Sequence, residues 1–210
     1  SDASAPRKDA KRQPAAVPKA PDETRVRTVP IPRLAQGGRW RVEAMRSYSG
    51  PVLYWFTRGQ GRITVAGITR GYGAHNAVFL PAGTMHGFDL GPQVFGTAVF
   101  FGKGSDVTLP DEPLHLRVRD TAPQAELSGV LDSIQRELES ARPGADRVAR
   151  HHLGLLGVWL ERQREVAMSE AKRPDAAKRL VARYTDLLEQ DYASGKGVAD
   201  YAAALGVTPT

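Results

Sequence analysis

The hydrophobic positions of the chain follow one spacing before Pro110 and another spacing after it. From residue 28 to about residue 108, short runs rich in Val, Tyr, Phe and Trp are separated by glycines and prolines. Runs of strand length joined by glycine turns predict an antiparallel β-barrel or sandwich, and no helix is expected in this stretch. The predicted strands cover residues 40–44, 52–57, 62–65, 77–80 and 94–101.

Beyond Pro110 the apolar residues recur at helical spacing. The first predicted helix ends at Pro143-Gly144, and its apolar stripe consists of Leu127, Leu131, Ile134 and Leu138. A second helix is expected over about residues 148–160, a third from about residue 174 to 192, and a short fourth over residues 198–205. A β half followed by an α half predicts an α+β chain of two domains rather than an alternating βαβ fold.

Composition narrows the possible classes of protein. The chain has 210 residues, and the absence of cysteine excludes disulfides, thiolate zinc sites and cysteine nucleophiles, as is common in the cytoplasm. No window approaches the roughly 20 apolar residues of a membrane span. Residues 1–27 contain four prolines among Ala, Lys and Arg, which predicts a disordered basic arm.

The net charge of +6 makes an acidic partner such as DNA plausible. The C-terminal end does not share this excess, because residues 174–210 carry four basic and five acidic side chains, a local charge of −1. Charge alone therefore does not identify a DNA-binding protein.

A turn sequence follows the predicted strand 77–80. It reads Pro81-Ala82-Gly83-Thr84-Met85-His86 and resembles the second conserved motif of the cupin barrel, Pro-x-Gly-x-x-His, which aims its histidine inward. In metal-dependent cupins this histidine is a ligand together with an earlier His-x-His pair and a nearby Glu.

This chain departs from the cupin pattern of metal ligands. The position of the His-x-His pair reads Ser47-Tyr48-Ser49, no Glu follows before Gly59, and only His75 lies near His86. We therefore expect no bound metal and no cofactor, because a catalytic divalent site needs about three protein ligands. His86 then has two interpretations, which are a donor in an effector pocket or a structural residue that satisfies its own turn.

The end of the chain carries a second motif. Ala202 is followed at a distance of four residues by Gly206, and then by Val207, Thr208 and Pro209. A small residue under a crossing helix, a left-handed glycine, an N-cap threonine and a first-turn proline predict the first half of a helix-turn-helix. Thr208 and Thr210 would lie on the DNA side of this unit.

The order of these elements resembles the AraC family of transcriptional regulators. In that family a cupin-like barrel precedes linker helices and a DNA-binding domain with two helix-turn-helix units. The resemblance implies a cytoplasmic, non-enzymatic homodimer that senses a small-molecule effector and binds operator DNA, with RNA polymerase as a further candidate partner. The chain is predicted to contain a disordered basic arm (1–27), a cupin-like effector-binding barrel (28–110), linker and dimerisation helices (111–172) and an incomplete helix-turn-helix domain (173–210).

Because the sequence stops at Thr210, where the first recognition helix would begin, specific operator binding is not expected from these 210 residues alone. Two other functions remain open. A cupin enzyme such as an isomerase or dioxygenase is opposed by the missing ligands and the helical half. A ligand-binding or dimerisation module without DNA binding is the other alternative.

An effector pocket is predicted from alternation along the first strand. Trp40, Val42, Ala44 and Arg46 would share one face, where Arg46 could pair with an anionic effector. Tyr48, Tyr54, Trp55 and Phe56 are candidates for aromatic walls, although alternation prevents all of them from pointing inward. The effector-binding residues predicted in this way are Trp40, Arg46, Tyr48, Trp55 and His86. The alternative is a core of aromatic residues with a surface arginine.

The second predicted helix has an apolar face broader than one contact requires. We expect Leu153, Leu156 and Leu160 to pair with the same helix of a second copy. The alternative is that these residues pack on the barrel and the preceding helix of their own chain.

Overall fold

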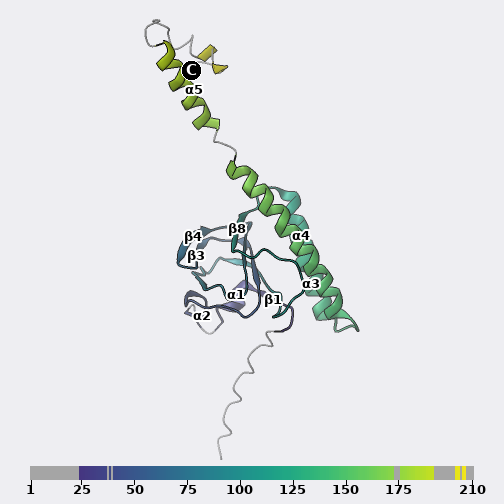
Figure 1. Cartoon of the computed structure of the whole chain (residues 1–210). Helices are drawn as coiled ribbons and strands as arrows, with labels where there is room; N and C mark the ends of the chain where they lie inside the picture. The colour runs from purple at the N-terminus through teal and green to yellow at the C-terminus, as the bar shows by residue number, and fades with distance from the viewer. Residues whose placement is uncertain are drawn as a thin grey trace, which may run out of the picture.

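The computed structural model describes residues 24–36, 38, 40–172, 176–191, 202–203 and 205–206. The first half of this chain forms two antiparallel sheets (Figure 1). In the five-stranded sheet the order is β1 (Arg27–Pro30), β7 (Phe95–Phe100), β2 (Val52–Arg58), β5 (Asn76–Leu80) and β8 (Leu114–Arg117). In the three-stranded sheet the order is β4 (Ile68–Tyr72), β3 (Gly61–Val65) and β6 (His86–Phe88). β4 and β8 are therefore edge strands.

Alternation along β2 divides the interior into two cores. Tyr54 and Phe56 belong to a core shared with Ile63 and Phe88 of the three-stranded sheet, whereas Leu53 and Trp55 belong to a core shared with the helices. Because successive side chains of a strand leave on opposite faces, one strand serves both layers. The five-stranded sheet is thus buried on both sides.

Two long helices cover the outer face of the five-stranded sheet (Figure 1). They are α3 (Thr121–Ser140) and α4 (Ala145–Lys172), and the stripes predicted for both are buried, with Leu138 of α3 partly so. The indole N–H of Trp159 on α4 donates to the carbonyl of Pro123 on α3 at 3.0 Å, which fixes the register of the pair. The prediction of a β-barrel-like domain followed by a helical region is confirmed.

Two details of the predicted β half are wrong. Residues 40–44 are not a strand, because Trp40–Glu43 forms a short helix, α2. The expectation that this stretch contains no helix is also wrong, since α1 (Ile31–Leu34) is a second short helix. Val42 is buried and Ala44 of the same supposed strand face is exposed. The backbone of α2 crosses so close to β6 that a Cβ on Gly87 would lie 2.7 Å from the carbonyl oxygen of Glu43. Because the close contact is with backbone, position 87 requires glycine, and the short helix α2 packs on β6 here.

The sheet also continues past the boundary predicted at residue 110, because β8 pairs with β5. The strand is not evident from the sequence because its four residues lie in a stretch where helical spacing is already expected. The helical layer begins at α3.

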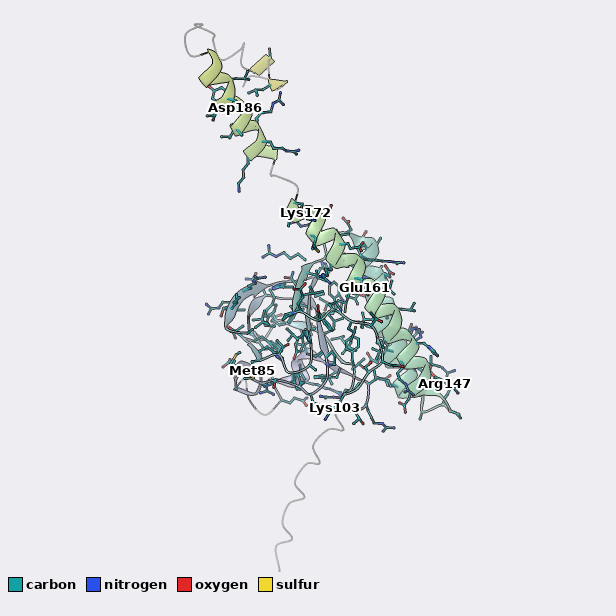
Figure 2. All side chains as sticks on the ribbon, in the orientation of Figure 1. Met85, Lys103, Arg147, Glu161, Lys172 and Asp186 are labelled. Carbon is teal, nitrogen blue, oxygen red and sulfur yellow. The ribbon has the colours of Figure 1, made fainter. Side chains whose placement is uncertain are left out.

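A last helix, α5 (Ala176–Asp191), lies beyond the end of α4 and away from the sheets (Figure 1). Figure 2 shows the same separation through Lys172 at the end of α4 and Asp186 on α5. Of the fourth helix predicted over residues 198–205, the structure describes residues 202, 203 and 205, and it also describes Gly206. Ala202 is buried, and Gly206 has a φ of +67°, as predicted for the turn residue. Thr208 and Thr210 lie outside the described residues, as do residues 1–23 of the arm predicted over residues 1–27. The end of that arm is not disordered, because Val26 packs against the core beneath the helices and Arg27 begins β1.

None of the helices in the described parts of the chain is long and apolar enough to cross a membrane.

Candidate functional site

The turn before His86 has the geometry that its sequence predicts. The N–H of Thr84 donates to the carbonyl of Pro81 at 3.2 Å, and Gly83 takes a φ of +79° that favours glycine. Gly83 in turn donates its N–H to the carbonyl of Tyr48 at 2.8 Å. Arg46 and His86 exchange two backbone hydrogen bonds of 2.8 Å. The turn is therefore held against the segment that leads into β2, and His86 points inward.

Both nitrogens of the His86 ring are occupied. Nδ1 lies 3.0 Å from the carbonyl of Thr84, and since a carbonyl can only accept, Nδ1 carries the proton. Nε2 then accepts from the hydroxyl of Tyr54 at 2.8 Å. Burial lowers the pKa of His86 and raises the pKa of Tyr54 well above its ordinary value. The pair is neutral at physiological pH and has no lone pair left for a metal.

Arg46 and Tyr48 complete what we call the His86 cluster, which consists of His86, Tyr54, Tyr48 and Arg46. The ring of Tyr48 packs edge-on against Phe100 at 4.9 Å between centroids and lies 5.6 Å from the ring of His86. The Nε of Arg46 is buried without a hydrogen-bond partner among the described residues. Three of the five residues predicted for the effector site are thus brought together.

The other two predicted residues lie elsewhere. Trp55 is on the opposite face of β2 from Tyr54 and packs in the core beneath the helices. Its ring faces His75 at 6.0 Å, so His75 is also separated from His86 by the sheet. Trp40 belongs to α2, and its side chain lies outside the described residues. Tyr54, which is not among the five predicted residues, is the hydrogen-bond partner of His86. Alternation along β2 separates Tyr54 from Trp55 but does not tell which of them faces His86.

No group of three His, Asp or Glu side chains within the described ranges could hold a metal ion. The nitrogens of His86 are also occupied by hydrogen bonds. For both reasons, the described residues do not fit the metal that cupin enzymes bind.

A cavity of about 190 Å³ lies at the other end of the space between the sheets, where β4 and β8 form the sheet edges. We call it the β4–β8 cavity. Its lining is apolar except for Arg70 and His115. The lining residues are Ile63, Val65, Ala66, Ile68, Arg70, Val78, Leu80, Pro113, Leu114 and His115.

Strand register explains why two polar side chains reach an apolar space. Arg70 on β4 pairs with Ile63 of β3, and His115 on β8 pairs with Val78 of β5. Paired residues of antiparallel strands extend to the same face, and both Ile63 and Val78 belong to the core between the sheets. Arg70 and His115 therefore flank the cavity from its two edges.

The half-buried ring of His115 is held in place by Asn76. Asn76 donates its amide N–H to the carbonyl of Ala74 at 3.3 Å, so its oxygen accepts from Nε2 of His115 at 2.8 Å. Burial lowers the pKa of His115, and the positive charges of Arg117 and Arg70 lower it further. The imidazole and the two guanidinium groups thus lie within electrostatic reach of one another. The sequence does not reveal this group, because β8 is not recognisable as a strand.

An open groove of about 680 Å³ adjoins the cavity and shares Arg70 and His115 with it. Arg117 and Arg119 line the groove from the sheet, and Ala167, Glu170 and Ala171 line it from the last turns of α4. The mouth of the β4–β8 cavity therefore faces the end of the helix that leads toward α5.

The residues predicted for dimerisation lie inside the chain. Leu153, Leu156 and Leu160 are fully buried against α3 and the five-stranded sheet, which is the packing alternative that the sequence left open. The apolar side chains that α4 exposes over the same stretch are Val148, Leu155 and Val158. These three residues share one face, because steps of three and seven residues return to nearly the same side of a helix. That face points away from the buried face formed by Leu153, Leu156 and Leu160.

No family model and no curated protein sequence matches the chain. Among solved structures, ToxT from Vibrio cholerae is 9% identical, with 88% of this chain and 72% of ToxT covered and a TM-score of 0.37. A cupin protein from Bacteroides fragilis is 15% identical, covers 30% of this chain and has a TM-score of 0.27, and this chain spans 55% of its length. Oxalate decarboxylase from Bacillus subtilis is 17% identical over 49% of this chain and 28% of the enzyme, with a TM-score of 0.26. Because these TM-scores are below 0.5, the similarities carry no weight for function.

Proposed function

We propose that the chain is the sensing and linker part of a DNA-binding transcriptional regulator of the AraC type, and that it is not an enzyme. The observation that carries this proposal is the joining of a cavity-bearing β-domain to helices that run on through α4 to α5 and the left-handed turn at Gly206. Figure 1 shows α5 away from the sheets, and a linker to a further domain is the role that we propose for this helical extension.

The chemistry of the His86 cluster agrees with this proposal. A metal-binding histidine needs a nitrogen lone pair for the ion, whereas both nitrogens of His86 are engaged by Thr84 and Tyr54. In a sensor, the same residues hold the turn and close one end of the barrel. The effector would then bind where the interior is open.

Binding of operator DNA is tested by selection from a random duplex library, using the protein produced with whatever coding sequence follows Thr210. We expect one sequence motif to be enriched, since a helix-turn-helix reads base edges in the major groove. The 210-residue chain, tested alongside, should enrich none. A protein with its full coding sequence that enriches no motif would overturn the regulator assignment.

A homodimer is part of the proposal, and we place its interface on the exposed face of α4 formed by Val148, Leu155 and Val158. Leu155 is 57% exposed and, with Val148 and Val158, forms an apolar stripe on this face of α4. Exposed apolar patches of this kind mark sites of contact with other proteins. Burying this face against a second copy would remove its apolar surface from water.

Sedimentation equilibrium tests this interface with two variants that each alter surface charge. Leu155→Glu should dissociate the dimer, whereas Asp132→Lys should leave it intact, because Asp132 is an exposed residue of α3 and lies outside the proposed interface. A wild-type chain that is monomeric at all concentrations, or a Leu155→Glu variant that stays dimeric, would exclude this interface.

A further inference from the structure

We infer that the β4–β8 cavity and its mouth bind a small organic anion, with the apolar body of the ligand in the cavity and its carboxylate between the guanidinium groups of Arg70 and Arg117. This inference rests on the proposed function, because it names the ligand class that such a sensor would recognise. Neither the cupin motif nor the predicted effector residues point to this site.

The charge at the mouth is the first argument. Neither Arg70 nor Arg117 takes part in any of the ion pairs formed between described residues. Two guanidinium groups outside those ion pairs and an imidazole therefore share one edge of the fold. Like charges held together beside an apolar wall attract an anion, and guanidinium binds carboxylate through paired hydrogen bonds.

The shape of the cavity is the second argument. About 190 Å³ of space lies behind these charges. This is below the roughly 300–1,000 Å³ of pockets that hold drug-sized ligands, so the ligand must be small. A single aromatic ring or a short branched chain fits such a space, and the apolar lining favours it over a sugar. An inorganic anion would leave the cavity unused.

The position of the groove is the third argument, because it relates the site to regulation. Glu170 is the one carboxylate that lines the groove among the described residues, and it comes from the last turns of α4. In the absence of a ligand it faces the arginines of β4 and β8 at longer range. A bound carboxylate would neutralise the mouth and weaken the attraction between Glu170 and the sheet. The end of α4, which leads to α5, would then change its dynamics on binding.

Isothermal titration of the 210-residue chain tests the site with three probes. Benzoate carries both the ring and the charge, benzamide keeps the ring without the charge, and inorganic phosphate has charge without a ring. We expect benzoate to bind at least tenfold more tightly than either of the others. Equal binding of benzamide or phosphate, or no binding of benzoate, would overturn the inference.

Two arginine variants test whether benzoate binds at the mouth of the β4–β8 cavity. Arg70→Gln should weaken benzoate binding at least tenfold, whereas Arg62→Gln should leave it unchanged, because Arg62 pairs with Gly71 and lies on the outward face of the same hairpin. Both positions are exposed, so neither variant should impair folding. Equal effects of the two variants would mean that benzoate responds only to net charge, which also overturns the inference.

Amide hydrogen exchange tests the relation to α4. Benzoate should alter exchange over residues 165–172 in the wild-type chain and not in Arg70→Gln. Binding without any change there would exclude the regulatory step. None of these measurements involves DNA, so a failure here is distinguishable from a failure of the regulator assignment, which the selection for an operator motif tests independently.

Discussion

The two ends of the space between the sheets differ in how completely side chains fill them. At the end formed by β6, the ring of His86 is fully buried and both its nitrogens are hydrogen-bonded, with aromatic rings packed around it. At the end formed by β4 and β8, a cavity remains, and arginines without ion-pair partners among the described residues stand at its mouth. The first arrangement stabilises the fold, whereas the second is suited to a ligand.

This difference shows that a turn which resembles the cupin motif need not form a binding site. The turn that resembles the cupin motif still aims its histidine inward, but Tyr54 occupies the nitrogen that a metal or effector would use. A ligand-binding site is instead expected where the edge strands of the two sheets leave a gap between them. In this chain that place is the seam between β4 and β8.

The largest expected effect is on stability, and it separates the two ends directly. His86→Leu should lower the free energy of unfolding by about 2–4 kcal/mol, because it leaves the buried hydroxyl of Tyr54 and the carbonyl of Thr84 without partners. His115→Leu should cost about 1 kcal/mol, since the ring is half-buried and loses one hydrogen bond to Asn76. Urea denaturation measures both, and equal losses would contradict the division of roles.

The next effect is on ligand binding and compares two valines of the same core. Val78 lines the β4–β8 cavity, whereas Val52 belongs to the same core but does not line the cavity. In Val78→Phe the added ring should enter the empty space, so benzoate binding falls more than tenfold while the melting temperature is kept. Val52→Phe should be destabilised by about 1–3 kcal/mol through overpacking and still bind benzoate. Calorimetry measures the binding and thermal unfolding measures the stability. Benzoate binding that is unchanged in Val78→Phe would exclude the cavity as the site.

The sequence predicts the closed end far better than the open one, and the reason is physical. A turn is specified locally, by Pro81 and Gly83, so its geometry and the direction of His86 follow from the residues themselves. The apolar stripes of α3 and α4 are equally local, and they too can be predicted. What lies opposite a side chain in space is not local, and so the pairing of Tyr54 with His86 cannot be read from the motif.

The open end depends on two edge strands that are distant in the sequence. Arg70 and His115 meet only because β3 and β5 carry them to the same seam, and β8 is too short to show alternation. The prediction for Trp55 is wrong for a related reason. Alternation states that Tyr54 and Trp55 face opposite ways, but it does not tell which side is the interior of the barrel.

The dependence of stability on pH offers a smaller contrast. The pKa of His86 is lowered in the folded chain, so below about pH 6.5 the unfolded chain binds a proton that the folded chain does not. Stability should therefore fall as the pH is lowered from about 7.5 to about 5. His86→Gln, which can still accept from Tyr54, should show a weaker fall over this range in urea denaturation series. A variant with an unchanged slope would show that His86 does not contribute to it.

The smallest expected effect concerns the carboxylate that shares the groove with the arginines. Removing its charge in Glu170→Gln should tighten benzoate binding about two- to fivefold, because exposed ion pairs contribute roughly 0.2–1 kcal/mol and this competition would be lost. Glu161→Gln, which removes the same charge from α4 at a position outside this groove, should leave the affinity unchanged. The difference between the two should shrink at high salt, because exposed charges are screened. Equal affinities for Glu170→Gln and the wild-type chain in low salt would mean that the end of α4 does not sense the mouth of the cavity, and the open end would then be a binding site without a route to the helix that follows it.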